Sequence, residues 1–219
     1  YLSVFNDYVF TNYESSSVDF FPYITINEDR IEGGVENKVG AEVFWKIDSS
    51  KQLNATFNPD FGQVESDDVV VNFSATETFY SDKRPFFSEN HSLFNVTAWR
   101  FLYVINTRRI GGEPDYDCSK FEDIQKDNCL NNKIGANDID YALRYSQQGE
   151  SLDVGFLGAS EADENFSQGK DFYSVRLRTR KDNLTVGYLG TYVDRPVIDR
   201  TAQVNSMDFD YRPSPELRI

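Results

Sequence analysis

The 219-residue chain has few of the residues that carry common catalytic and metal chemistry: two cysteines, one histidine and one methionine. A catalytic triad would depend on His91 alone, and no nucleophile elbow, phosphate loop, dinucleotide fingerprint or paired-histidine metal motif accompanies it. A carboxylate pair for glycoside hydrolysis could be drawn at will from 36 acidic residues, so such a pair carries no information. The sequence therefore offers no catalytic residue and favours a non-enzymatic role.

The chain also lacks long hydrophobic runs and blocks of positive charge. Its longest apolar run spans only Phe101 to Ile105, whereas a membrane-spanning helix needs about 20 apolar residues. The net charge is −14, and no cationic block is longer than Arg108-Arg109, so a nucleic-acid backbone would be repelled. These absences exclude a helical membrane protein and argue against nucleic acid as a partner. They do not exclude a transmembrane β-barrel, because strands with alternating apolar and polar residues never give a strong hydropathy peak.

Neither end of the chain carries a typical signal. It opens at Tyr1 without an initiator methionine or an apolar leader, and it closes at Ile219 without the terminal aromatic residue of a complete outer-membrane barrel. No linker or composition shift divides it. We therefore expect residues 1–219 to be one β-rich domain that is a portion of a longer protein.

What the sequence has in abundance is alternation of apolar and polar residues. Val43 and Trp45 alternate with Glu42 and Lys46, for example, as on a strand with one buried face. The same period of two recurs in six segments: 39–47, 52–58, 138–145, 173–178, 184–192 and 207–212. In the third segment it places Ile139 and Tyr141 on one face. Polar turn residues separate the segments, so we predict an all-β antiparallel up-and-down meander of about nine or ten strands and no long helix.

Two long connections interrupt this rhythm, at residues 60–95 and 111–137. Connections of this length inside a compact domain are usually functional or disordered. The second holds Cys118 and Cys129, whose spacing fits no zinc motif. In an oxidising compartment these cysteines are expected to form a disulfide, and otherwise they are two free thiols. A short helical turn is possible over residues 119–128.

The first connection overlaps the densest stretch of the chain, which runs from Asn58 to Phe87 and is closely followed by Glu89. It begins with a turn-forming sequence, and it ends with a basic and aromatic cluster surrounded by acids. The residues that we single out in this stretch are Asn58, Pro59, Asp60, Phe61, Gly62, Glu65, Glu77, Lys83, Arg84, Phe86, Phe87 and Glu89. The phenylalanines favour a buried structural anchor, with Arg84 pairing to Glu77 or Glu89. A sugar-binding surface is the alternative.

The acids of this stretch raise one metal hypothesis. Asp60, Glu65, Asp67 and Asp68 could offer oxygen ligands to a calcium ion, but their order does not match an EF-hand loop. Acid clusters are common in a chain this acidic. We therefore predict neither a metal site nor a cofactor, with calcium as the alternative.

Three sequence words resemble a known family: NPDFGQVESD, ETFYSDKRPFFSEN and TRRIGG. They are similar to the hallmark of an uncharacterised family of Gram-negative outer-membrane proteins, in which a β-barrel usually follows a carbohydrate-binding module like that of family 9. The resemblance implies a β-barrel fold, an outer-membrane location, membrane lipid as a partner and oligosaccharide as a possible second one. It implies no reaction.

Charged residues on the polar sides of the strands form a second candidate site. A transverse charge ladder inside a barrel would orient polar solutes, and structural ion pairs are the alternative. The ladder residues are Arg100, Asp138, Asp140, Arg176, Arg178, Arg180, Asp208 and Asp210.

Alternation alone does not distinguish a membrane barrel from a water-soluble sandwich. If the chain forms part of a barrel, we expect a channel, receptor or surface scaffold. If it forms a sandwich, we expect a secreted glycan-binding module. In a barrel, one set of residues forms a continuous outward apolar belt, and in a sandwich the same set meets in a dry core. That set is Val43, Trp45, Leu53, Phe57, Val175, Leu177, Val186 and Tyr188.

Overall fold

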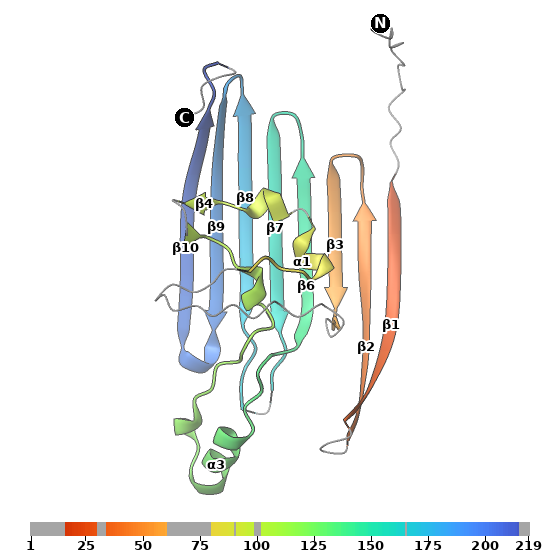
Figure 1. Cartoon of the computed structure of the whole chain (residues 1–219), viewed down its shortest axis with the longest axis vertical. Coiled ribbons are helices and arrows are strands. Elements are labelled where there is room, and N and C mark those ends of the chain that lie inside the picture. The colour runs from red at the N-terminus through yellow and green to blue at the C-terminus, as the bar shows by residue number, and fades with distance from the viewer. Residues whose placement is uncertain are drawn as a thin grey trace, which may run out of the picture.

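The chain folds around one large antiparallel sheet (Figure 1). The computed structural model describes residues 16–29, 34–60, 80–89, 91–98, 102–164 and 166–214. Eight strands follow one another in the order β1-β2-β3-β6-β7-β8-β9-β10, so neighbours in the sheet are neighbours in sequence apart from the connection between β3 and β6. Their bounds are β1 Ser17–Asp29, β2 Gly34–Lys46, β3 Lys51–Phe57, β6 Ile139–Gln148, β7 Leu152–Glu161, β8 Asp171–Lys181, β9 Leu184–Arg195 and β10 Arg200–Tyr211. The predicted all-β antiparallel meander is confirmed.

The connection between β3 and β6 carries the short elements. They are α1 Pro85–Ser88, α2 His91–Phe94, β4 Thr97–Ala98, β5 Leu102–Tyr103, the 3-10 helices η1 Thr107–Arg109 and η2 Cys118–Lys120, and α3 Asp123–Asn131. A third 3-10 helix, η3 Pro196–Ile198, joins β9 to β10. Strands β4 and β5 pair only with each other in the described chain. In Figure 1 this connection crosses one face of the large sheet, and α3 extends beyond one end of it. We call residues 80–112 the inserted segment.

Local turn chemistry explains why the strands reverse where they do. Asp182 has a positive φ of 52° in the two-residue turn between β8 and β9, a conformation that Asp and Asn tolerate better than most residues. Between β2 and β3, the Asp48 carboxylate accepts hydrogen bonds from the backbone N–H groups of Ser50 and Lys51 at 2.7 and 2.9 Å. Each turn therefore fixes the register of the strands beside it.

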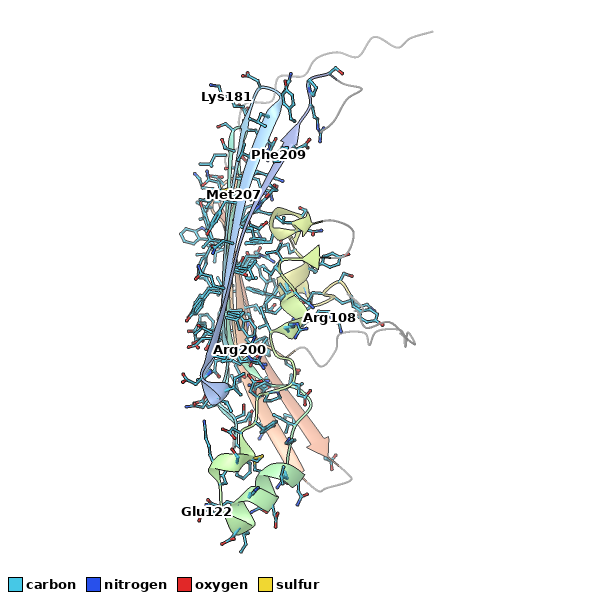
Figure 2. The ribbon with its side chains drawn as sticks, turned by 90° about the vertical axis from the view of Figure 1, so that its left-hand side faces the viewer. Arg108, Glu122, Lys181, Arg200, Met207 and Phe209 are labelled. Atoms are coloured by element: carbon cyan, nitrogen blue, oxygen red, sulfur yellow. A yellow bond between two sulfur atoms is a disulfide. The ribbon has the colours of Figure 1, made fainter. Side chains whose placement is uncertain are left out.

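The strand register places the apolar side chains on one face of the sheet and the polar side chains on the other. Trp45 lies opposite Leu53, which in turn lies opposite Tyr145. The row continues with Phe156 and Val175 on the next two strands. This row belongs to the apolar face, which carries all of the predicted belt residues. Their side chains are exposed or half-buried, and Figure 2 shows α1, α2, β4 and β5 on the other side of the sheet, with α3 beyond one end of it.

The hydrophobic core lies instead between the polar face and the inserted segment. Phe86, Leu93 and Phe94 are buried against the sheet, and a row of small or aliphatic side chains receives them. The sheet residues of this core are Ile139, Ala142, Leu157, Ala159 and Leu189. Gly155 permits the closest approach, because a Cβ atom there would lie 2.8 Å from the Phe94 ring. The segment is thus packed onto the sheet.

Three sequence predictions need correction or completion. A β-bulge separates Ile139 from Tyr141, so Ile139 turns to the covered face and is buried, whereas Tyr141 remains on the apolar face. The missed helices α1 and α2 are only four residues each, too short for a periodic signal. The strands form an open sheet: in the described chain, the outer edges of β1 and β10 pair with no strand.

Candidate functional site

The candidate site is the covered polar face, where buried arginines of the sheet hold the inserted segment. Arg144 on β6 is 3% exposed. Its Nη1 donates to the carbonyl oxygens of Phe86 and Glu89, the latter at 2.7 Å, and its Nη2 pairs with the Glu89 carboxylate. The buried amide of Asn54 on β3 donates to the same carboxylate at 2.7 Å. Helix α1 is therefore tied to two strands by charge-assisted hydrogen bonds.

Arg176 on β8 plays the same part for α2. It is 2% exposed, and its Nε donates to the carbonyl oxygen of Leu93 at 3.1 Å. Its two Nη atoms pair with both carboxylate oxygens of Asp208 on β10. The Arg176–Asp208 ion pair lies over Gly187 on β9, the strand between β8 and β10. A Cβ atom at this glycine would lie 2.6 Å from Nη1 of Arg176. This arginine connects β8, β10 and the inserted segment.

Two of the family-like sequence words meet inside the inserted segment. Arg84 pairs with Asp82 at 2.6 Å and donates to the carbonyl oxygens of Thr107 and Ile110, both at 2.7 Å. The Thr107 hydroxyl donates to Asp82 at 2.8 Å. Burial by itself raises the pKa of Asp82, but the hydrogen bonds and charge of Arg84 outweigh it, so the pKa lies below its usual value. The two sequence words therefore encode a hydrogen-bonded cluster of Asp82, Arg84, Thr107 and Ile110, which we call the clasp.

After Arg144 and Arg176, a third buried charged residue of the sheet, Glu161, joins the clasp to the sheet. Glu161, at the end of β7, is 3% exposed and accepts a hydrogen bond from the backbone N–H of Gly111 at 2.8 Å. The Nζ of Lys170 lies 3.6 Å from the same carboxylate. Gly111 has a φ of +73°, which explains why the first of the two glycines in TRRIGG is a glycine.

The structure describes seven of the eight residues of the predicted charge ladder, and most of them form ion pairs. Arg178 and Arg180 both contact Asp153 on β7, which is 0% exposed and which the sequence analysis missed. Asp138 pairs with Lys38 at 2.6 Å, and Asp210 pairs with Arg212 at 3.0 Å. Asp140 lies at the bulge and is exposed. Arg100 is outside the described residues.

The structure describes only the two ends of the motif segment. Asn58 donates to the carbonyl oxygen of Val39 at 2.7 Å and accepts from the Tyr23 hydroxyl at 3.0 Å. The Asp60 N–H donates to the same hydroxyl at 3.1 Å, and Pro59 is buried beside it. The remaining predicted residues outside the described part of the chain are Phe61, Gly62, Glu65, Asp67, Asp68 and Glu77.

At the other end of the stretch, Phe86 and Phe87 are buried, Lys83 is exposed, and Glu89 pairs with Arg144. Arg84 pairs with Asp82, a partner that the sequence analysis did not name, and the predicted pairing with Glu77 lies outside the described residues.

The second long connection is held by a disulfide between Cys118 and Cys129, with a Cα–Cα distance of 5.7 Å. It joins η2 to α3. In the described part of the chain, no three His, Cys, Asp or Glu side chains converge as metal ligands. No described helix is long and apolar enough to cross a membrane.

Comparison with known proteins places the chain in a family. A family model described as a domain of unknown function (DUF5916) matches residues 17–184, which is more than half of the chain. The chain belongs to this family. The match runs from β1 to the start of β9, so it takes in the inserted segment and its anchoring residues on β6 and β8. No curated protein and no solved structure gave a match.

Proposed function

We propose that this chain forms part of the wall of an outer-membrane β-barrel in a Gram-negative bacterium, with its apolar face against lipid and the inserted segment across the lumen. The observation that carries this proposal is the uncovered apolar face. Phe20, Met207 and Phe209 are 60%, 83% and 69% exposed, and they belong to strands at opposite edges of the sheet. A contiguous apolar patch larger than a few hundred Å² is rare on a monomeric water-soluble protein.

Strand length supports the same function. Seven of the eight strands have 10 to 13 residues. A tilted strand needs about 9 to 11 residues to cross a bilayer core. The exception is β3, with seven residues.

The inserted segment decides which kind of barrel is proposed. Its core residues and the Arg144 and Arg176 anchors occupy the side that would face the lumen. A polar face so occupied is not the lining of a permanently open pore. We therefore favour a closed or gated receptor or scaffold over an open channel. Oligosaccharide as its ligand rests on the family resemblance alone.

The water-soluble glycan-binding sandwich is the weaker alternative. A sandwich buries its apolar face under a second sheet. Within the described ranges the only other sheet is β4-β5, and the segment that carries it packs on the opposite, polar face. No observation favours the sandwich.

Spin labels on two adjacent residues test the membrane assignment. Met207→Cys places a label on the apolar face of β10, and Ser206→Cys places the matched control on the other face at nearly the same depth. In nanodiscs, the label at 207 should collide with lipid-soluble oxygen and be protected from a water-soluble nickel chelate. The label at 206 should not show this pattern. Equal nickel access at both positions would refute a lipid-facing sheet.

A further inference from the structure

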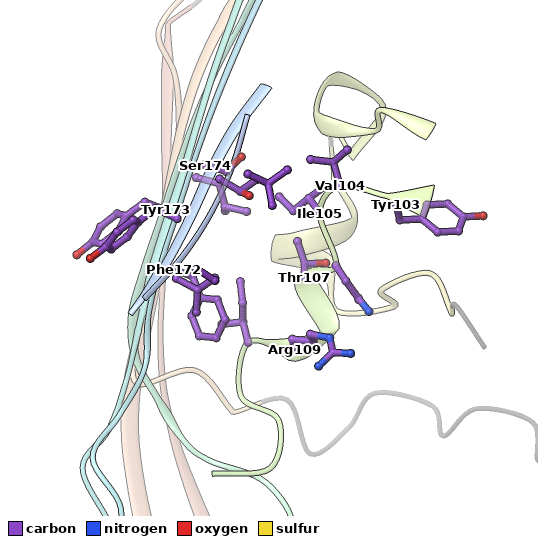
Figure 3. A pocket seen from close by; sticks show the side chains of 16 residues that line it. Tyr103, Val104, Ile105, Thr107, Arg109, Phe172, Tyr173 and Ser174 are labelled. Atoms are coloured by element: carbon purple, nitrogen blue, oxygen red, sulfur yellow. The ribbon is translucent and has the colours of Figure 1, made fainter. Parts of the chain in front are cut away.

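Two neighbouring cavities lie between the inserted segment and strands β8 to β10. The first has a volume of about 250 Å³ and is mostly apolar. In Figure 3, Val104 and Ile105 of the segment stand on one side of it, and Phe172 and Ser174 of β8 stand on the other. Val204 on β10 also lines it. An apolar cavity of roughly 150 Å³ is enough to hold benzene, so this one can hold an aromatic ring or a short aliphatic chain.

The second cavity is a cleft of about 630 Å³ with a different chemical character. Five cationic residues line it, against two acidic ones. The cationic residues are Arg108, Arg109, Lys133, Lys170 and Arg195, and the acidic ones are Glu113 and Asp115. The lining residues themselves are net positive by three charges, five minus two, and the buried Glu161 carboxylate beside Lys170 reduces this excess to two, although the whole chain carries −14. A cleft with low-dielectric walls concentrates such a field and attracts anions.

Most of these cationic groups, Arg108 and Arg109 among them, are already engaged in contacts, which fixes the walls of the cleft. Arg195 holds both oxygens of Asp115, and Lys170 donates to the carbonyl oxygen of Glu113 at 2.9 Å. The hydrogen bonds and charge of Arg195 lower the pKa of Asp115, so that pair persists across neutral pH. Lys133 Nζ lies 5.5 Å from the centroid of the Tyr116 ring, at the edge of the same cleft.

The two cavities share part of their walls. Arg109, Phe172, Val193 and Ala202 line both. An apolar chamber and a cationic cleft thus adjoin across a boundary that contains a guanidinium group. We infer that this is a binding site for a small amphipathic anion, whose ring or short chain fills the apolar chamber and whose carboxylate or phosphate lies in the cleft. The site does not depend on what covers the apolar face of the sheet.

Calorimetry with matched probes tests this site. Full-length protein is titrated with 3-phenylpropionate, with the neutral 3-phenylpropanol and with the cationic 3-phenylpropylamine, and heats from protein-free nanodiscs are subtracted. We expect the acid to bind at least about tenfold more tightly than the alcohol, and the amine not to bind. Acetate, which has the head group without the ring, should bind too weakly to detect. Equal binding of acid and alcohol, or no binding of either the acid or phenyl phosphate at millimolar concentration, overturns the site.

A phenyl phosphate titration distinguishes the two head groups. Tighter binding of phenyl phosphate assigns the cleft to phosphate, and tighter binding of 3-phenylpropionate assigns it to carboxylate. Either preference supports the site. If neither ligand binds, the result contradicts the site.

Two variants test the two halves of the site separately. Lys133→Gln should weaken 3-phenylpropionate binding roughly two- to fivefold, the effect of losing one solvent-exposed charge. Lys126→Gln removes an exposed cation of α3 that does not line the cleft, so binding should be unchanged. Val204→Phe fills the apolar chamber and should reduce the affinity more than about tenfold. Full affinity in Val204→Phe protein with an intact circular dichroism spectrum would place the ligand elsewhere and refute the site.

Discussion

The two faces of the sheet follow the same alternating sequence but are covered very differently. The polar face carries the buried Arg144 and Arg176 and receives the inserted segment, so that both guanidinium groups are enclosed by protein. The apolar face carries side chains such as Val175 and Leu177, which remain 39% and 43% exposed. A water-soluble fold normally shows the reverse, because burying apolar area drives folding and burying charge opposes it. This inversion is what we expect if the apolar face lies against lipid, as proposed above, while the inserted segment covers part of the polar face.

The largest expected effect comes from breaking the covered face at its central anchor. Arg144→Met leaves Glu89 and two carbonyl oxygens without their cation, and we expect a loss of about 3 kcal/mol in the stability of the docked segment. This is the low end for a broken buried pair, since Glu89 is partly exposed. The measurement is protease protection of the inserted segment, together with single-channel conductance in planar bilayers. New conductance should appear as the segment undocks.

The matched control for this change is Arg212→Gln, which breaks an arginine–aspartate pair at the end of β10, where the Arg212 side chain is exposed. It should alter neither protection nor conductance, because such pairs contribute little. Wild-type protease protection in Arg144→Met protein would contradict the anchoring role.

A charge on the apolar face tests the other side of the comparison. Val175→Lys places a cation in the middle of β8, where a bilayer would penalise it by about 2–4 kcal/mol. Leu152→Lys carries the same change to the start of β7, where the cost should be about 0–1 kcal/mol. The measurement is unfolding from lipid vesicles in urea. If both variants are as stable as the wild type, the face does not contact hydrocarbon.

A smaller effect is expected where the segment touches the sheet most closely. Gly155→Ala adds a methyl group 2.8 Å from the Phe94 ring and 3.0 Å from Leu93, which should destabilise docking by about 1–3 kcal/mol. Gly34→Ala is the control, because a Cβ atom there meets nothing within 4 Å. Hydrogen exchange of residues 91–98 should accelerate only in the first variant. Unchanged exchange in Gly155→Ala protein would show that the contact is not needed.

The smallest expected effect is the dependence of the clasp on pH. Because the folded pKa of Asp82 lies below its usual value, its stabilising contribution is complete above about pH 4 and is lost as pH falls through the folded pKa. Protease protection of the inserted segment should therefore hold from pH 7 to 4 and decline below. Asp82→Asn should remove this decline, and a decline that persists in that variant would assign it to another group.

The amino-acid sequence by itself determined the fold class and the two faces. Its period of two puts Val43, Trp45 and Val175 on one side of the strands, since side chains alternate along any extended backbone. The sequence also marked Phe86 and Phe87 as a buried anchor, because clustered aromatic residues rarely remain in water.

Only the tertiary structure decided which partners these residues meet. Arg144 contacts Glu89 across 55 residues, and Glu161 contacts Gly111 across 50, and no local pattern encodes pairings at such a distance. A one-residue bulge sends Ile139 to the opposite face from the one that the alternation predicts. The two adjoining cavities likewise exist only because the inserted segment comes to lie over β8 to β10. Periodicity is a property of neighbouring residues, whereas packing depends on where distant parts of the chain come to lie.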